Sequence, residues 1–246
     1  VLLREAGIPP AKALLDHASA RFALRLHRLD NAHPLRQRLL SLPVFPTDNR
    51  LSRCLGLLPW PVEHVTPLLY PPWVAPPTQA ELHDQLGHLT ADRMASAASF
   101  RSWLTGRSPE DVVVFTDGSR SSEGLAGAGW VVTQGGRVLY HDNLPLGNRA
   151  EVFDAEARAA LMGLQSARRL RPQSPVFLCL DNLQVACQLT SSFLSPQSSQ
   201  SVFASFHKLA ANGPSVQVRW CPGHAGIDGN ELADMEAKTG ASAPLN

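Results

Sequence analysis

The second half of the sequence predicts an α/β fold, in which a mixed β-sheet carries helices on its faces. From residue 111 onward, short runs rich in β-branched residues alternate with longer amphipathic runs, and the first three short runs follow one another directly. The order is three strands, a helix, a strand, two helices, a strand and a helix. Strands linked by hairpins pair antiparallel and strands joined through a helix pair in parallel, so both kinds of pairing are expected.

Each expected strand has its own signal. The run DVVVFTD at 111–117 is β-branched and ends in a carboxylate. The run AGAGWVVTQGGRVLYHDNL at 126–144 divides at Gly135-Gly136, which is typical of a hairpin turn. The run PVFLCLD at 175–181 again ends in aspartate, and SVQVRW at 215–220 is the last strand.

The amphipathic runs predict four helices. Their apolar residues recur at helical spacing. These runs are EVFDAEARAALMGLQSARRL at 151–170, LQVACQLTSSF at 183–193, SSQSVFASFHKLAANG at 198–213 and GNELADMEAK at 229–238.

The first 110 residues are organised differently. We expect a helical connector over 1–42, a Pro-rich linker with short helices over 43–110 and the α/β domain over 111–246. The first helix is expected to end at about Asn31, because leucines and a phenylalanine recur there at helical spacing: Leu14, Leu15, Phe22, Leu26 and Leu29. Its other side carries Arg21, Arg25 and Arg28, which form either a solvated basic face or a phosphate-binding face.

Composition restricts the class of protein only loosely. The chain has a net charge of +1, and 44% of its residues are hydrophobic, which is ordinary for a globular protein. Its 4 cysteines form no CxxC pair, so an intracellular, reducing compartment is expected, in the nucleus or the cytoplasm. No apolar stretch is long enough to span a bilayer. The chain begins at Val1, so we expect it to be a piece of a longer polypeptide.

Two expected strands end on a carboxylate. Asp117 and Asp181 stand at the carboxyl ends of strands that a crossover helix makes parallel, so both are expected at one edge of the sheet. A single strand-end aspartate is usually a cap or turn residue. Two carboxylates at one edge repel each other, and a bound Mg²⁺ ion, which prefers oxygen ligands, usually offsets this repulsion.

Further acids lie in two helical runs. Near the start of the run at 151–170, Glu151 and Asp154 fit a first turn, whereas Glu156 lies among apolar residues and needs a partner or a metal.

The stretch GHAGIDGNELAD at 223–234 contains three more acids. Asp228 and Glu231 have the spacing of a capping box, so they are expected to start the last helix. Asp234 has no capping duty and requires a functional explanation. His224, on a loop flanked by glycines, is either a proton-transfer group or an ordinary surface histidine.

Four short blocks together resemble the signature blocks of type 1 ribonuclease H over about residues 111–240. They are TDGS at 116–119, AE at 155–156, DN at 181–182 and GHAGIDGNELAD at 223–234. The resemblance implies a ribonuclease H-like fold, with a five-stranded mixed sheet of three antiparallel and two parallel strands and flanking helices. The helical and Pro-rich segment would precede this fold.

The resemblance also implies a site and an activity. The catalytic, metal-binding acids would be Asp117, Glu156, Asp181 and Asp234, holding two Mg²⁺ or Mn²⁺ ions, with His224 assisting proton transfer or product departure. Residues Gly118, Ser119 and Asn182 of these blocks would bind substrate. The activity would be endonucleolytic hydrolysis of the RNA strand of an RNA/DNA hybrid.

The particular residues in and around these blocks suggest a polyprotein. The run VFDAEARAAL resembles ribonuclease H domains of retroelement polyproteins. AGIPP at 6–10 and HPLR at 33–36 flank a helix that resembles the segment after the polymerase in fungal non-LTR retrotransposon reverse transcriptases. An upstream polymerase domain is therefore an expected partner, with no membrane, and the oligomeric state stays open.

Two alternatives stay open beside this activity. One is a catalytically inactive ribonuclease H-like connection or nucleic-acid-binding domain of a decayed retroelement, which should have lost an acid. The other is a nuclease or transposase of the same fold. All four motif acids are present, which favours the enzyme.

Overall fold

The computed structural model describes residues 9–29, 33–35, 37, 77–87, 92–191 and 198–243. The chain forms two compact units, Val1–Leu69 and Tyr70–Asn246, and each is described by itself. Of the Pro-rich linker expected over 43–110, residues 43–76 and 88–91 lie outside the described residues. Among those residues, no helix combines the length and apolar character that a membrane crossing requires.

The first unit contains helix α2, Ala11–Arg28. It starts directly after Pro10, and the backbone becomes extended at Leu29, so the helix ends three residues before the expected Asn31. Ala23 and Leu26 are buried. Leu24 is partly buried, and three large apolar residues of this helix are about half exposed: Leu14, Leu15 and Phe22.

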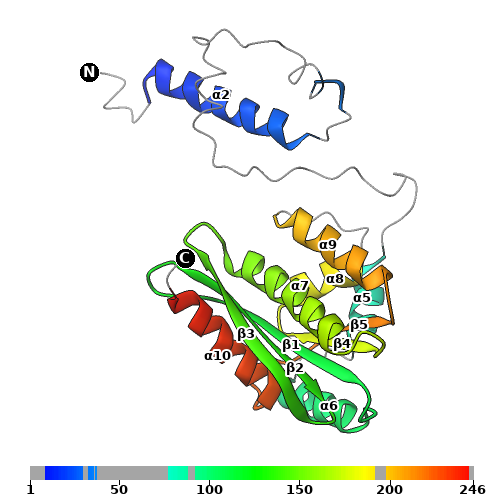
Figure 1. Ribbon diagram of the computed structural model, residues 1–246. Coiled ribbons are helices and arrows are strands. Elements are labelled where there is room, and N and C mark those ends of the chain that lie inside the picture. The colour runs from blue at the N-terminus through cyan, green and yellow to red at the C-terminus, as the bar shows by residue number, and fades with distance from the viewer. Residues whose placement is uncertain are drawn as a thin grey trace. The chain divides into compact units, whose positions relative to one another are not determined.

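The second unit contains a five-stranded mixed sheet in the order β3-β2-β1-β4-β5 (Figure 1). The strands are β1 Val112–Arg120, β2 Ala126–Gln134, β3 Arg137–Gly147, β4 Val176–Leu180 and β5 Val216–Trp220. Strands β1, β2 and β3 pair antiparallel, whereas β4 pairs in parallel with both β1 and β5. The expected fold class, sheet and element order are therefore confirmed.

Helices cover both faces of the sheet (Figure 1). The helices are α5 Gln79–Leu86, α6 Arg93–Thr105, α7 Val152–Leu170, α8 Leu183–Thr190, α9 Gln200–Ala211 and α10 Asp228–Ser242. Val112 and Val114 of β1 point into one apolar cluster with residues of α5, α7, α8 and α9. Val113 and Phe115 point into the other, with residues of α6 and α10. Because side chains alternate along a strand, β1 supplies both cores.

Helix α10 lies unusually close to the sheet because β2 has glycines beneath it. A Cβ atom on Gly127 would lie 2.0 Å from the backbone nitrogen of Ala241, and one on Gly129 would lie 2.2 Å from that of Ala237. Any side chain at either glycine would push the helix away. This close packing fixes the position of the residues that α10 carries.

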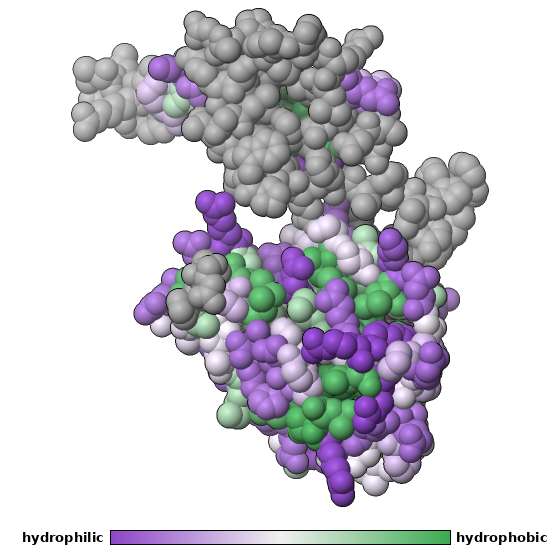
Figure 2. Space-filling view, in the orientation of Figure 1, coloured by the Kyte–Doolittle hydropathy of each residue, from purple (hydrophilic) through white to green (hydrophobic). Residues whose placement is uncertain are grey.

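The surface of the second unit mixes residue types. Figure 2 shows patches of hydrophobic residues among hydrophilic ones on the face in view. Val138 and Met235 are among the large apolar side chains that remain exposed. Scattered exposure of this kind is normal for a globular protein.

Candidate active site

Asp117 and Asp181 lie just beyond the last parallel pair of β1 and β4. Asp181 directly follows β4, as expected, whereas the expected end of β1 at Asp117 is wrong, because β1 continues to Arg120 in its pairing with β2. Phe115 of β1 is the register partner of Cys179 of β4, and each aspartate stands two residues beyond that pair. The shared edge follows from the parallel pairing. The structure thus brings Asp117 and Asp181 together.

Glu156 reaches the same edge from helix α7. Its side chain is 2% exposed, and its carboxylate, with those of Asp117 and Asp181, forms a group whose oxygen atoms lie within 4.8 Å of one another. Gly118 allows this approach, because a Cβ atom there would lie 2.5 Å from the backbone nitrogen of Glu156. We call Asp117, Glu156 and Asp181 the three-carboxylate group.

The protein holds these acids at an energetic cost. Burial, followed by the charge of Asp181, raises the pKa of Asp117 to about 7. Burial and then the charge of Asp117 raise the pKa of Glu156 well above its usual range, and burial also raises the pKa of Asp181. Oxygen Oε2 of Glu156 is buried and has no hydrogen-bond partner among the described residues. Buried carboxylate oxygens whose negative charge is not balanced suit a divalent cation such as Mg²⁺.

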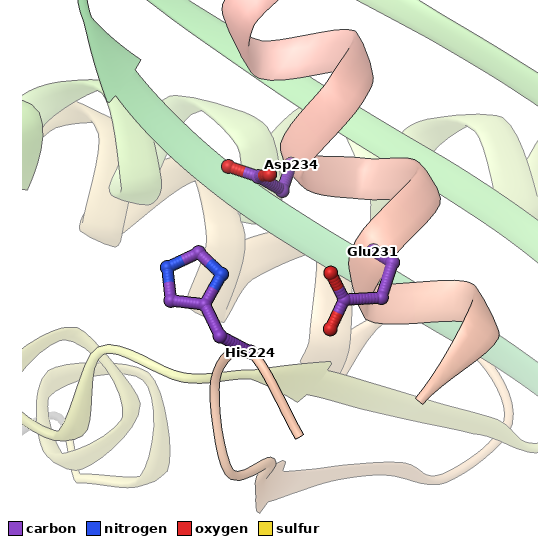
Figure 3. Close-up of side chains that lie close together, drawn as sticks. All are labelled: His224, Glu231 and Asp234. Carbon is purple, nitrogen blue, oxygen red and sulfur yellow. The ribbon is translucent and has the colours of Figure 1, made fainter. Parts of the chain in front are cut away.

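A second group lies beside the first. His224, Glu231 and Asp234 each offer a ligand atom within 4.8 Å of the others, and their side chains face a common space (Figure 3). His224 comes from the loop after β5, and both acids come from α10. Nitrogen Nζ of Lys238 lies 2.6 Å from Oδ2 of Asp234 and balances its charge.

The two groups influence each other. The charge of Asp234 raises the pKa of both Asp117 and Asp181, whereas His224 lowers that of Asp181. The loop before α10 also touches the first group, because a Cβ atom on Gly223 would lie 2.2 Å from Oδ2 of Asp181. The four acids expected from the sequence therefore form one electrostatically connected site, and their catalytic roles stay predictions.

The expected capping box at the start of the last helix is wrong. Ile227, and not Asp228, is the N-cap of α10, and it makes no side-chain cap. Oxygen Oε1 of Glu231 instead accepts the backbone N–H of Gly226 at 3.2 Å. Burial of Ile227 in the apolar cluster beneath α10 explains the shift, since it places Asp228 inside the first turn.

The prediction that Glu151 and Asp154 belong to the start of this helix is confirmed. Glu151 is the N-cap of α7 and forms a capping box with Asp154. Asp154 also accepts hydrogen bonds from the hydroxyls of Ser198 and Ser199. These two acids stabilise the start of the helix that carries Glu156.

The expected substrate-binding residues have structural roles in part. Gly118 packs against α7, as described above. Asn182 is the N-cap of α8, and its Oδ1 accepts the N–H of Val185 at 3.1 Å. Ser119 is half-buried in β1 opposite Gly127 of β2. Substrate contact by these residues stays a prediction.

Sequence reasoning missed several residues around the site. Asn230 is 2% exposed and donates a side-chain hydrogen bond that lowers the pKa of Asp181. Lys238 could have been found from its i,i+4 spacing to Asp234. The guanidinium of Arg101, on α6, donates to the backbone carbonyls of Ala225 and Gly226, and no local pattern announces that contact.

A cavity of about 580 Å³ lies near this loop but away from the carboxylates. It is bounded by α6, the β2–β3 turn and the first turn of α10. Its lining contains no member of the three-carboxylate group. The chemistry therefore points to the carboxylates and not to this cavity.

The strand order, the helices on both faces and the acids in β1 and directly after β4 define a ribonuclease H-like α/β domain. The profile of the RNase H family matches residues 109–242, and the chain belongs to this family.

Several solved structures are similar in part. The N-terminal ribonuclease H domain of a Mycobacterium tuberculosis protein, solved as a fusion with maltose-binding protein, is 24% identical; the match covers 53% of this chain and 96% of that one, with a TM-score of 0.46. Ribonuclease H1 of Halobacterium salinarum is 22% identical over 53% and 96%, with a TM-score of 0.46. The protease-reverse transcriptase of prototype foamy virus is 24% identical over 56% and 22%, with a TM-score of 0.47. A comparison with curated proteins finds no match.

Proposed function

We propose that the chain is a metal-dependent endonuclease that hydrolyses the RNA strand of RNA/DNA hybrids. The observation that carries this proposal is the three-carboxylate group, with ligand oxygens within 4.8 Å and pKa values raised by burial and mutual repulsion. Such a group is unfavourable without a cation and serves no structural purpose that the fold requires. Family membership supports the nuclease assignment.

The donor set fits two divalent cations. Asp117, Glu156 and Asp181 would hold one ion, and Asp117 with Asp234 the other. Bound ions supply activation of water and stabilisation of the charge that develops on the phosphate. Mg²⁺ is the proposed ion because the acids offer only oxygen ligands, and Mn²⁺ is the alternative.

The residues around the acids complete the proposed chemistry. Asn230 donates a hydrogen bond to Asp181, Gly223 leaves room for the Asp181 carboxylate, and Lys238 pairs with Asp234. His224 faces Asp234 and Glu231 from an exposed loop, so its ring can exchange protons with solvent and with the scissile phosphate. Because the ions reverse the local potential, an acidic site can accept an anionic strand.

The proposed setting is the polyprotein of a retrotransposon, with a polymerase domain upstream. It rests on the resemblances described in the sequence analysis. An upstream polymerase would hold the hybrid on this domain.

The test is cleavage by residues 1–246 of matched RNA/DNA, RNA/RNA and DNA/DNA duplexes, with Mg²⁺ and with EDTA. Cleavage of only the RNA strand of the hybrid, lost in EDTA, is the expected result. Asp234→Asn should abolish it. Asp228→Asn is the matched control, because Asp228 lies on the same helix and is exposed outside both acidic groups. Hybrid binding without cleavage, at any Mg²⁺ or Mn²⁺ concentration, would instead favour the inactive binding domain.

A further inference from the structure

Helix α6 precedes the family match at 109–242 and still packs onto the sheet. The ring centroids of Phe100 and Phe115 are 6.4 Å apart, and those of Trp103 and Phe177 are 5.6 Å apart. The guanidinium carbon of Arg219 lies 4.4 Å from the Trp103 ring centroid. These contacts fix α6 against β1, β4 and β5.

Arg101 lies on this anchored helix and turns toward the loop of residues 221–227, which we call the His224 loop. Nitrogen Nη2 of Arg101 donates to the carbonyl of Ala225 and, at 3.2 Å, to that of Gly226. The neighbouring Phe100 is 2% exposed, so the helix cannot roll without disrupting the core. Arg101 therefore connects a rigid element to a loop 124 positions further along the chain.

The His224 loop has a backbone that needs such support. His224 has a φ of 49°, and Gly226 has a φ of 66°. The left-handed region is unfavourable for a residue with a Cβ atom, so His224 stays there only while its surroundings hold it. Residues 221–227 lie between β5 and α10 and belong to neither element.

Two charged side chains bind the peptide group between Ala225 and Gly226. Arg101 donates to its carbonyl, and Glu231 accepts its N–H at 3.2 Å. A Cβ atom on Gly226 would lie 3.3 Å from Nη2 of Arg101, which shows how closely the guanidinium approaches. Both hydrogen bonds leave from one nitrogen of the guanidinium, so a lysine, which carries three N–H donors on a shorter side chain, can replace them only in part.

We propose that Arg101 is a positioning residue: it holds the His224 loop in its left-handed conformation and so keeps the His224 ring turned toward Asp234 and Glu231. The catalytic consequence rests on the proposed function, whereas the hold on the loop does not. The segment before the family match would thus belong to the working nuclease and not merely link it to what precedes.

The experiment compares Arg101→Ala and Arg101→Lys in residues 1–246 with the matched control Arg137→Ala. Arg137 is exposed at the start of β3 and pairs with Gln134 of β2, five positions along β2 from Gly129, the partner of Asp117. Its removal also deletes one positive charge. Hydrogen–deuterium exchange of the peptide covering 221–227 is measured first, because it needs no activity. Melting temperature and the kcat and KM for hybrid cleavage are measured on the same samples.

For Arg101→Ala we expect the 221–227 peptide to exchange about tenfold faster, with unchanged exchange in β1 and α7. Arg101→Lys should be intermediate, and Arg137→Ala should match wild type. We expect kcat to fall about tenfold with KM nearly constant, because a displaced loop misplaces a group of the site without removing a substrate contact.

Unchanged exchange at 221–227 in Arg101→Ala overturns the proposal, whatever the activity. Faster exchange throughout the protein also overturns it, because Arg101 would then merely stabilise the fold; the lysine variant decides this if the alanine variant does not fold. Faster loop exchange with an unchanged kcat removes the positioning role. A wild-type protein that cleaves no hybrid counts against the proposed function, while the exchange data still decide whether Arg101 holds the loop.

Discussion

Replacing Asp117 by asparagine should stabilise the protein in the absence of divalent cations, and the effect should depend on pH. The substitution keeps the shape of the side chain and removes its charge. The hydrogen bond from the N–H of Gly118 to Oδ1 of Asp117, 2.8 Å long, survives because an amide oxygen accepts it equally well. The main change is therefore the loss of a buried carboxylate beside Asp181 and Glu156.

The magnitude follows from the pKa of Asp117. Folding raises it from an ordinary 3.8 to about 7, and each unit corresponds to about 1.4 kcal/mol, giving on the order of 4 kcal/mol as an upper limit. Because the folded pKa is the higher one, this contribution is fully present below about pH 4 and is lost as pH rises through about 7. At pH 8 the wild type has lost this contribution of Asp117 to the free energy of unfolding. Asparagine does not titrate, so the variant loses nothing at this position.

The assay is urea unfolding in EDTA at pH 4.5, 6 and 8, with ionic strength held constant. We expect the asparagine variant to exceed the wild type in free energy of unfolding by a few kcal/mol at pH 8 and to approach it at pH 4.5. Adding Mg²⁺ at pH 8 should stabilise the wild type more than the variant, because a ligand of the cation is missing. Equal stability of the two proteins at every pH, or a less stable variant at pH 8, would refute the electrostatic reasoning.

Four further changes have defined outcomes. Asp181→Asn should abolish Mg²⁺-dependent hybrid cleavage without lowering the melting temperature; retained cleavage would remove Asp181 from the metal site. Glu231→Gln should cost about 1 kcal/mol or less in urea unfolding and keep cleavage, since an amide oxygen still accepts the same N–H; a stable, inactive variant would make Glu231 a ligand. Gly118→Ala should lower the free energy of unfolding by about 1–3 kcal/mol, because the added Cβ atom would meet the α7 backbone. It should also weaken Mn²⁺ binding in titration calorimetry, and binding as tight as in the wild type would contradict this. Hybrid affinity should fall more steeply with salt for residues 1–246 than for 70–246, because α2 carries arginines; equal slopes would show that the first unit holds no substrate.

The sequence predicts the sheet and the first acids well because both depend on local patterns. Each strand is a short β-branched or apolar run, and the parallel pairing of the strands that precede Asp117 and Asp181 follows from the helix between them. Glu156 was predictable because an acid among apolar helix positions needs a partner. These inferences require neighbours in sequence and the handedness of crossovers, and no knowledge of distant contacts.

The features that the sequence did not predict depend on packing between distant segments. The pattern of Asp228 and Glu231 fits a capping box, but burial of Ile227 decides where α10 begins. The left-handed backbone of His224 has no sequence signal, because the residue is not a glycine. Arg101 lies far from the loop that it contacts, and only the aromatic contacts of α6 with the sheet bring the two together.

The close packing of α10 on Gly127 and Gly129 of β2 has a consequence for biosynthesis. Ribosomes build chains from the amino terminus, so Asp117, Glu156 and Asp181 are made before the helix that carries Asp234. Until the residues of α10, through Ser242, have emerged from the ribosome, Gly127 and Gly129 of β2 have no helix packed on them and the set of four acids is incomplete. Under the proposed function, the nascent domain is therefore inert as a nuclease until α10 has emerged and packed against β2.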